Sequence, residues 1–326
     1  MHPDLFVVDG HADTLYRALR RGKRWEEPDA ESQTDLPRFV RGGVNLQVFA
    51  LFSDPAHRGV GFAVRALEMI NAFFRGIEGA RENPTLASSL SGIGCVLRKG
   101  DVERARGGFW GLLSIEGGEA IGGSVDALEA YFRFGVRAMG LVWNHRNELA
   151  DGVAEAESGG GLTRLGREVV RRMNEWGMLV DVSHLSETGF WDVVRCAKAP
   201  IYASHSNARR LCNHPRNLSD DQLKAVADSG GVVGINFCDY FLVDSGDANV
   251  DHVIDHIAYI SDLVGIEHVG LGTDYDGIET PPVGLEDVSK LPRLHGALEE
   301  RGFDESAIRA VLGENLARLY QAVLPA

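Results

Sequence analysis

The sequence has few cysteines, a deficit of basic residues and no long hydrophobic run. Its 326 residues include four cysteines without C-x-x-C spacing, which predicts reduced, mostly buried thiols. Lys and Arg number 33 against 47 Asp and Glu, a formal net charge of −14. This charge repels phosphate backbones and anionic membranes, so we expect no nucleic acid partner. No apolar run approaches the roughly 18 residues of a membrane span.

The N-terminal stretch "MHPDLFVVDGHAD" also lacks the basic segment and apolar core of a secretory signal. The sequence therefore predicts a cytoplasmic protein with no membrane partner.

Short apolar runs alternate with segments of helical period, a pattern typical of βα units around a parallel sheet. Eight such units in one repeating pattern predict an α/β fold, a TIM-type (β/α)8 barrel that forms a single domain over residues 1–326. The predicted strands are Leu5–Gly10, Val44–Phe52, Phe109–Gly117, Val136–Asn144, Gly177–Ser183, Ala199–His205, Gly231–Phe237 and His268–Asp274.

Helices are predicted between these strands from their caps and periodicity. Three of them begin at Ser or Thr and end at glycine: Ser124–Gly135, Thr163–Gly177 and Ser219–Gly230. Residues 250–265 and 304–323 add two more helical patterns. Residues 22–42 and 53–108 do not fit a minimal barrel, and we expect helical and loop decorations there.

Residues that bind metals or transfer protons follow six of the eight predicted strands. They are His11 and Asp13, Glu116, His145, His184, His205 and Asp274. Active sites of such barrels lie at the C-terminal face, so these side chains are expected to converge. Taken singly, each also has a structural interpretation, such as a helix N-cap at Asp13 or a buried imidazole at His184. Their joint placement at strand ends favours the functional interpretation.

Histidines and carboxylates form a donor set suited to Zn²⁺, with Mn²⁺, Co²⁺ and Fe²⁺ as competitors. Five such ligands, including carboxylates that can bridge, suffice for two ions about 3.5–4 Å apart. A water between two ions becomes hydroxide near neutral pH and supplies a nucleophile for hydrolysis without serine or cysteine.

Other catalytic signatures are missing. The sequence contains no G-x-S-x-G elbow, no Walker A loop and no H-E-x-x-H motif. His252 and His256 lie one helical turn apart, a spacing that can bind metal. Because they fall on a predicted outer helix, we expect them to be surface histidines.

Six separated motifs, in order from about residue 7 to about residue 320, carry a family resemblance. They are "DGHADTL", "SIEGGEAIGG", "LVWNHRN", "GLTRLGREVVRRMNEWGMLVDVSHLS", "YASHSNARRLCNHPRNLSDDQL" and "GLGTDYDG" followed by "GLEDVSKLP". Together they resemble the membrane dipeptidase (renal dipeptidase, peptidase M19) family. No leader or lipid-anchor tail is visible in the sequence, so we expect a soluble bacterial-type member of this family.

This resemblance implies a barrel with two zinc ions that hydrolyses small dipeptides, including those with a D-residue at the C-terminal position. His11 and Asp13 would hold one zinc, His184 and His205 the other, and Glu116 would bridge both. Members of this family often form dimers, so the resemblance is also compatible with a homodimer of this chain.

The resemblance also implies roles beside the metals. Asp274 would be the acid/base residue, His145 would contact the substrate carbonyl, and Arg216 would bind the substrate's terminal carboxylate. Arg209 and Arg210 are alternatives to Arg216. The remaining candidates are Asp276, expected to shape its loop, and Tyr240 or Phe241, expected to wall the pocket.

Two other functions remain open on the sequence. An amidohydrolase acting on another small amide or lactone usually carries His-x-His on strand one and a lysine on strand four, whereas this chain has His-x-Asp and no such lysine. A metal-free barrel that serves as a binding protein would leave several acidic side chains repelling one another at its mouth.

Overall fold

The computed structural model describes residues 5–57 and 59–326 and contains a ring of parallel strands. The strand order is β7-β6-β5-β4-β2-β1-β9-β8, and a parallel bridge between Ala203 and Val233 joins the two end strands. The strands are β1 Val7–Ala12, β2 Val44–Phe52, β3 Ile93–Cys95, β4 Phe109–Glu116, β5 Val136–Gly140, β6 Leu179–Asp181, β7 Ile201–Tyr202, β8 Val233–Ile235 and β9 Val269–Leu271. The predicted (β/α)8 barrel is confirmed.

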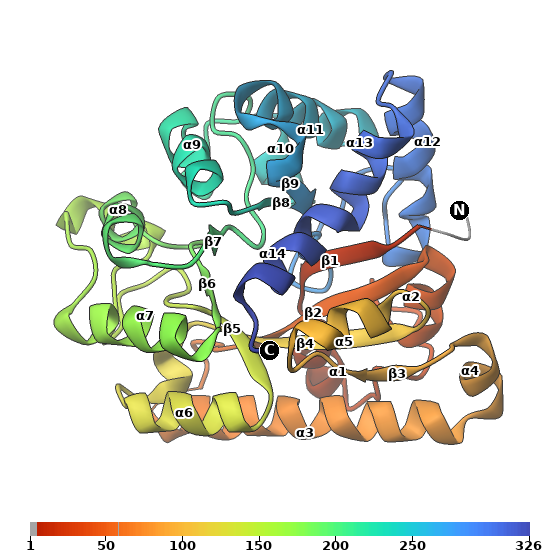
Figure 1. The fold of residues 1–326 in the computed structure, drawn as a ribbon, viewed down its shortest axis with the longest axis horizontal. Helices are drawn as coiled ribbons and strands as arrows, with labels where there is room; N and C mark the ends of the chain where they lie inside the picture. Colours follow the sequence, from red (N-terminus) through yellow and green to blue (C-terminus); the bar gives the residue numbers. More distant parts are fainter. Residues whose placement is uncertain (1–4, 58) are drawn as a thin grey trace.

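Helices surround this ring, and the long helix α3, drawn in orange, runs along one side of the molecule (Figure 1). The α-helices are α1 Thr14–Arg21, α2 Leu36–Gly42, α3 Val60–Glu82, α4 Pro84–Ser89, α5 Lys99–Ala105, α6 Val125–Arg133, α7 Arg164–Trp176, α8 Glu187–Cys196, α9 Asp220–Asp228, α10 Asp239–Leu242, α11 Val250–Val264, α12 Pro292–Glu300, α13 Glu305–Arg309 and α14 Asn315–Val323. Shorter elements are the 3₁₀-helices η1 Gly118–Ile121, η2 Val153–Ser158, η3 Ile266–His268 and η4 Val288–Lys290, and the π-helix η5 Ala310–Glu314. Among the described residues, no helix is both long and apolar enough to span a membrane.

The barrel interior is apolar at the end opposite the strands' carboxyl termini. Leu316, Leu319 and Tyr320 of α14 pack in one cluster with Phe6 and Val8 at the start of β1. Figure 1 shows α14, in blue, lying across the middle of the molecule beside β1. This packing closes one end of the barrel and leaves the carboxyl ends of the strands to form the site.

Strands β5 to β9 are shorter than predicted. At β6 and β7, side-chain hydrogen bonds replace strand pairing where the chain turns toward the site. Asp181, at the end of β6, is 3% exposed. Its Oδ1 atom accepts hydrogen bonds from the backbone N–H groups of Ser183 and Ser204, each at 2.9 Å. The chain therefore leaves the ladder two or three residues before the predicted ends at Ser183 and His205.

The helix caps follow the prediction closely. Thr163 caps α7 through a 3.0 Å bond from the N–H of Gly166, and Gly177 ends α7 at a φ of 71°. Helices α6 and α9 instead take Phe134 and Ser229 as C-caps, so the predicted glycines come one residue later.

The two predicted decorations pack against each other over β2 and β4. Trp25, from the first decoration, stacks on Phe73 of α3 with ring centroids 6.0 Å apart, and its indole N–H donates to the carbonyl of Ala72. The ring also contacts Phe49 of β2. The second decoration contains an unpredicted strand, β3, which pairs with the start of β4. Both segments are thus part of the core.

The expectation of two surface histidines on α11 is wrong for His256. This residue is 1% exposed, on the inner face of the helix. Its Nδ1 accepts the N–H of Ala208 at 3.1 Å, and its Nε2 lies 3.1 Å from the carbonyl of Leu242. Both of its ring nitrogens are used to hold the loops after β7 and β8, and its function is structural.

Candidate metal centre and active site

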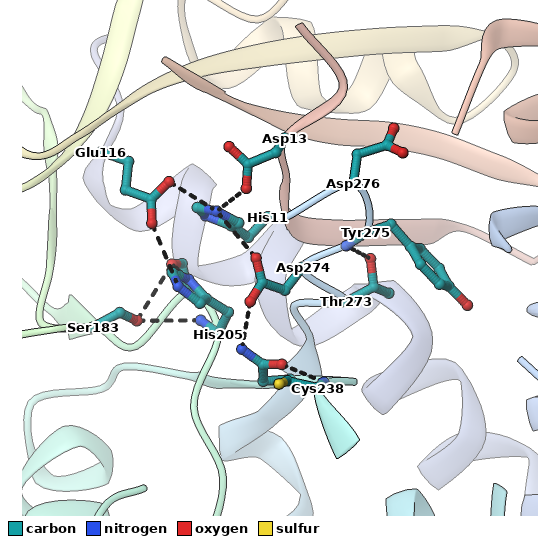
Figure 2. Close-up of polar contacts among 12 residues, drawn as sticks. His11, Asp13, Glu116, Ser183, His205, Cys238, Thr273, Asp274, Tyr275 and Asp276 are labelled. Carbon is teal, nitrogen blue, oxygen red and sulfur yellow. Dashed lines mark hydrogen bonds and ion pairs between the residues drawn. The ribbon is translucent and has the colours of Figure 1, made fainter. Parts of the chain in front are cut away.

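One group of ionisable side chains surrounds His11 of β1. Its Nε2 atom lies 3.4 Å from Oε2 of Glu116, 3.6 Å from Oδ2 of Asp13 and 3.8 Å from Oδ1 of Asp274. Glu116 ends β4, Asp13 precedes α1, and Asp274 follows β9. Figure 2 shows the three carboxylates pointing toward His11 from different directions. Residues far apart in sequence thus meet because their strands end at the same face.

A second group lies on the other side of Glu116. His184 and His205, which follow β6 and β7, place their Nε2 atoms 3.1 and 3.8 Å from Oε1 of Glu116 and 2.9 Å from each other. Glu116 therefore offers one oxygen to each group. Among residues 5–57 and 59–326, three sets of potential metal-ligand atoms lie within 4.8 Å of one another: His11, Asp13 and Glu116; Glu116, His184 and His205; and His11, His205 and Asp274.

In the second group, hydrogen bonds to the Nδ1 side of each ring orient His184 and His205. Nδ1 of His184 lies 2.8 Å from Oδ1 of Asn144. Nδ1 of His205 lies 2.6 Å from Oγ of Ser204, which in turn donates to Asp181 at 2.5 Å. These partners place the ring proton on Nδ1 and leave Nε2 with its lone pair facing Glu116, the arrangement that metal-binding histidines use.

The backbone at the site adopts an uncommon conformation. Within residues 5–57 and 59–326, positive φ values at non-glycine residues occur at His184, Asp274 and Asp276, at 68°, 62° and 67°. Such conformations are disfavoured and concentrate at functional sites. Asp9 in β1 holds the turn before Asp274, because its carboxylate accepts the N–H and hydroxyl of Thr273 at 2.9 and 2.7 Å.

Burial and mutual repulsion make the acidic cluster unfavourable without cations. Burial and the neighbouring Glu116 raise the pKa of Asp13 to about 7, and burial raises the pKa of Asp274 to about 6. Burial opposes ionisation of Glu116 as well, but His11 and His184 hold its pKa below the usual range. Several carboxylates are thus concentrated among largely buried side chains.

Unpartnered buried atoms show that these residues fit a divalent metal. Both ring nitrogens of His11, Oδ1 of Asp13 and Oε2 of Glu116 have no hydrogen-bond partner among the described residues. Leaving such atoms unsatisfied is costly. The nitrogen and carboxylate donors are those that zinc and similar ions accept.

A cleft of about 1000 Å³ opens above this cluster. Its walls include Trp143, His145, Arg216, Tyr240 and Phe241. Arg216 is 5% exposed, and its Nη2 donates to the carbonyl of His205 at 3.2 Å. His145 and Tyr240, each 64% exposed, lie at the rim and outside the buried cluster. The same cleft is therefore lined by the buried cation Arg216 and by the candidate metal ligands.

Asp276 lies apart from the cluster, and Figure 2 shows its carboxylate turned away from it. It accepts hydrogen bonds from the Ser32 hydroxyl at 2.8 Å, from the Gln33 N–H at 2.7 Å and from the Thr34 hydroxyl. Asp276 thus holds the segment of residues 22–42 in place beside the cleft.

The sequence did not single out the residues that support the candidate metal ligands. Asn236 donates from Nδ2 to Oδ2 of Asp274 at 2.9 Å, and Asp9, Asn144, Asp181 and Ser204 act as described above. Most of them are polar residues within or beside apolar runs, as in "FVVDGH" and "GVVGINF". Because buried polar groups need partners, this pattern was the available signal.

Comparisons with known proteins agree with this fold and site. A family model described as membrane dipeptidase (peptidase family M19) matches residues 1–324. A solved structure of the M19 metallopeptidase dipeptidase AC is 32% identical and covers 99% of this chain and 100% of its own, with a TM-score of 0.91. A metallopeptidase from Rhodobacter sphaeroides, solved with a phosphinate mimic of the dipeptide L-Ala-D-Ala, is 31% identical over 98% of this chain and 99% of its own, with a TM-score of 0.89.

A relative of unassigned function from Klebsiella pneumoniae, described as a protein in the pqqA 5′ region, is 38% identical over 249 residues, which are 73% of this chain and 92% of that protein. The family match spans nearly the whole sequence, and the structural neighbours at 31–32% identity are metallopeptidases, one of them described as a dipeptidase of family M19. The chain therefore belongs to the membrane dipeptidase family, peptidase family M19.

Proposed function

We propose that this protein hydrolyses dipeptides with two zinc ions bound at the carboxyl end of the barrel. Its family and structural neighbours support a metal-dependent dipeptidase. The two-ion proposal depends on the position of Glu116. Its two carboxylate oxygens face two separate groups of potential ligand atoms. One carboxylate with a ligand set on each side is what a bridged pair of ions requires.

In this proposal, His11 and Asp13 hold one ion, His184 and His205 hold the other, and Glu116 bridges them. When bound, the ions supply an activated water and polarise the carbonyl group of the substrate. Zinc is favoured by the mixture of imidazole and carboxylate donors.

Asp274 is the proposed proton carrier. Asn236 holds one of its oxygens at 2.9 Å, while the other faces the cluster 3.8 Å from His11. A carboxylate fixed in this way accepts a proton from the attacking water and returns it to the leaving amine. The elevated pKa of Asp274, about 6 because of burial, suits a group that must both gain and lose a proton near neutral pH.

The remaining proposed roles concern substrate binding. Arg216 would bind the terminal carboxylate, since it is the buried cation of the cleft wall and Arg209 and Arg210 do not line the cleft. His145 would contact the carbonyl of the scissile bond from the rim, and Tyr240 would wall the pocket. By analogy with the Rhodobacter sphaeroides enzyme, whose bound ligand mimics L-Ala-D-Ala, we extend the proposed substrates to dipeptides with a C-terminal D-residue.

A comparison of free and amidated dipeptides tests this function. We expect the protein to release amino acids from L-L and L-D dipeptides, and Arg216→Met to lower kcat/KM on free dipeptides by roughly 10- to 100-fold, because charged hydrogen bonds to the carboxylate are lost. Amidated dipeptides lack that carboxylate, so the variant should affect them little. An equal loss on both substrates would remove Arg216 from this role, and no hydrolysis of any dipeptide by the unaltered protein would refute the function.

A further inference from the structure

A second cavity of about 390 Å³ adjoins the cleft behind His184 and Arg216. We call it the side cavity. It shares Val153, His184, Pro215 and Arg216 with the cleft, and its other lining residues include Val182, Leu185, Ser206, Arg209 and Leu218. A molecule bound in the cleft against Arg216 would therefore lie next to the side cavity.

The side cavity contains buried hydrogen-bonding groups without partners. Ser206 is 1% exposed, and its hydroxyl has no hydrogen-bond partner among the described residues. The same holds for Nε of Arg216, which is 5% exposed. Leaving a buried polar group without a hydrogen-bond partner is unfavourable. These groups can therefore hydrogen-bond a polar atom of a ligand bound in the side cavity.

The charges on its lining favour an anion. Arg209 and Arg216 contribute two cations, and Glu187 contributes one carboxylate. Arg209 donates from Nε to the carbonyl of Asn217 at 2.9 Å, which fixes its guanidinium at the wall. Its Nη1 lies 3.6 Å from Glu187, whose side chain is 59% exposed and therefore well solvated. Among the described residues, no other hydrogen bond of the Arg209 side chain is found, so its remaining N–H groups are available to an acceptor.

We propose that the side cavity receives the side chain of the substrate's C-terminal residue and prefers a carboxylate there, as in aspartate or glutamate. This inference rests on the proposed function, because Arg216 can place the terminal carboxylate at the mouth of the cavity only if a dipeptide binds in the cleft. Arg209 and the Ser206 hydroxyl would then recognise the second carboxylate, while Leu185 and Leu218 contact its methylene groups.

The test measures kcat/KM for L-Ala-Gly, L-Ala-Leu, L-Ala-Asn, L-Ala-Asp and L-Ala-Glu. We expect the acidic substrates to be preferred over L-Ala-Asn, and Arg209→Gln to lower kcat/KM for them by about 10-fold while L-Ala-Gly is unaffected. Arg210→Gln is the matched control, because Arg210 is the exposed neighbour and lines neither cavity. Ser206→Ala, checked for unchanged metal content, should lower the rates for L-Ala-Asp and L-Ala-Asn but not for L-Ala-Gly.

Equal effects of Arg209→Gln on all five substrates, or no effect on any, would overturn the assignment of the side cavity. A preference for L-Ala-Asn equal to that for L-Ala-Asp would overturn the choice of a carboxylate. Failure of the unaltered protein to hydrolyse any of the five, including L-Ala-Gly, would instead refute the proposed function.

Discussion

Replacing Asp274 with asparagine should lower kcat by about 10²- to 10⁴-fold and leave the metal content unchanged. Asparagine keeps the shape of the side chain and can still accept the hydrogen bond from Asn236 through its amide oxygen. It cannot accept a proton from water at neutral pH, so the proposed proton transfer is lost. Steady-state kinetics on L-Ala-L-Ala and elemental analysis of the same preparation measure both quantities.

Asp276→Asn is the matched control. Asp276 lies two residues away and shares the positive φ, but its carboxylate holds Ser32, Gln33 and Thr34 and does not face the ligand cluster. We expect a much smaller loss of kcat for this variant. Near-normal turnover by Asp274→Asn would exclude Asp274 as the proton carrier. Loss of metal from that variant would make Asp274 a ligand, in keeping with the third set of close donor atoms.

Glu116→Gln should remove most of the bound metal. Changes to residues that only orient metal ligands cost about 10–100-fold in metal affinity, so loss of a carboxylate shared by two sites should cost more than about 100-fold. We therefore expect the metal content to fall below one ion per chain after dialysis, together with a loss of dipeptidase activity. Elemental analysis before and after dialysis measures the effect.

Glu119→Gln provides the comparison for Glu116→Gln. Glu119 lies in the turn η1 directly after β4, is half-buried and has a pKa that burial raises, but it belongs to none of the close ligand sets. We expect the Glu119→Gln variant to retain its bound metal. Full metal occupancy in Glu116→Gln would contradict a bridging role, and equal losses in both variants would point to a disturbed fold.

Much of the fold is predictable from the sequence, because strands buried on both faces read as apolar runs. The β2 strand has the predicted bounds, Val44–Phe52, and all eight barrel strands are found. Strand β3 was missed because it has three residues within a segment of mixed character. The burial of Trp25 was also missed, since its partners Phe49 and Phe73 lie on elements distant in sequence.

The convergence of side chains at the strand ends was predictable for a related reason. Parallel strands of a barrel share one carboxyl face, so position in sequence gives position in space. Six of the seven predicted side chains lie in one buried cluster, whereas His145 lies at the rim. The side cavity and the buried position of His256 depend on how loops and helices pack, which periodicity alone does not reveal.

The most direct test of this account is the metal content of the unaltered protein, purified without chelators and assayed for dipeptidase activity on the same preparation. We expect about two zinc ions per chain, activity that is lost on treatment with a chelator, and activity that returns when zinc is added back. A protein that hydrolyses dipeptides with no bound divalent ion would contradict it.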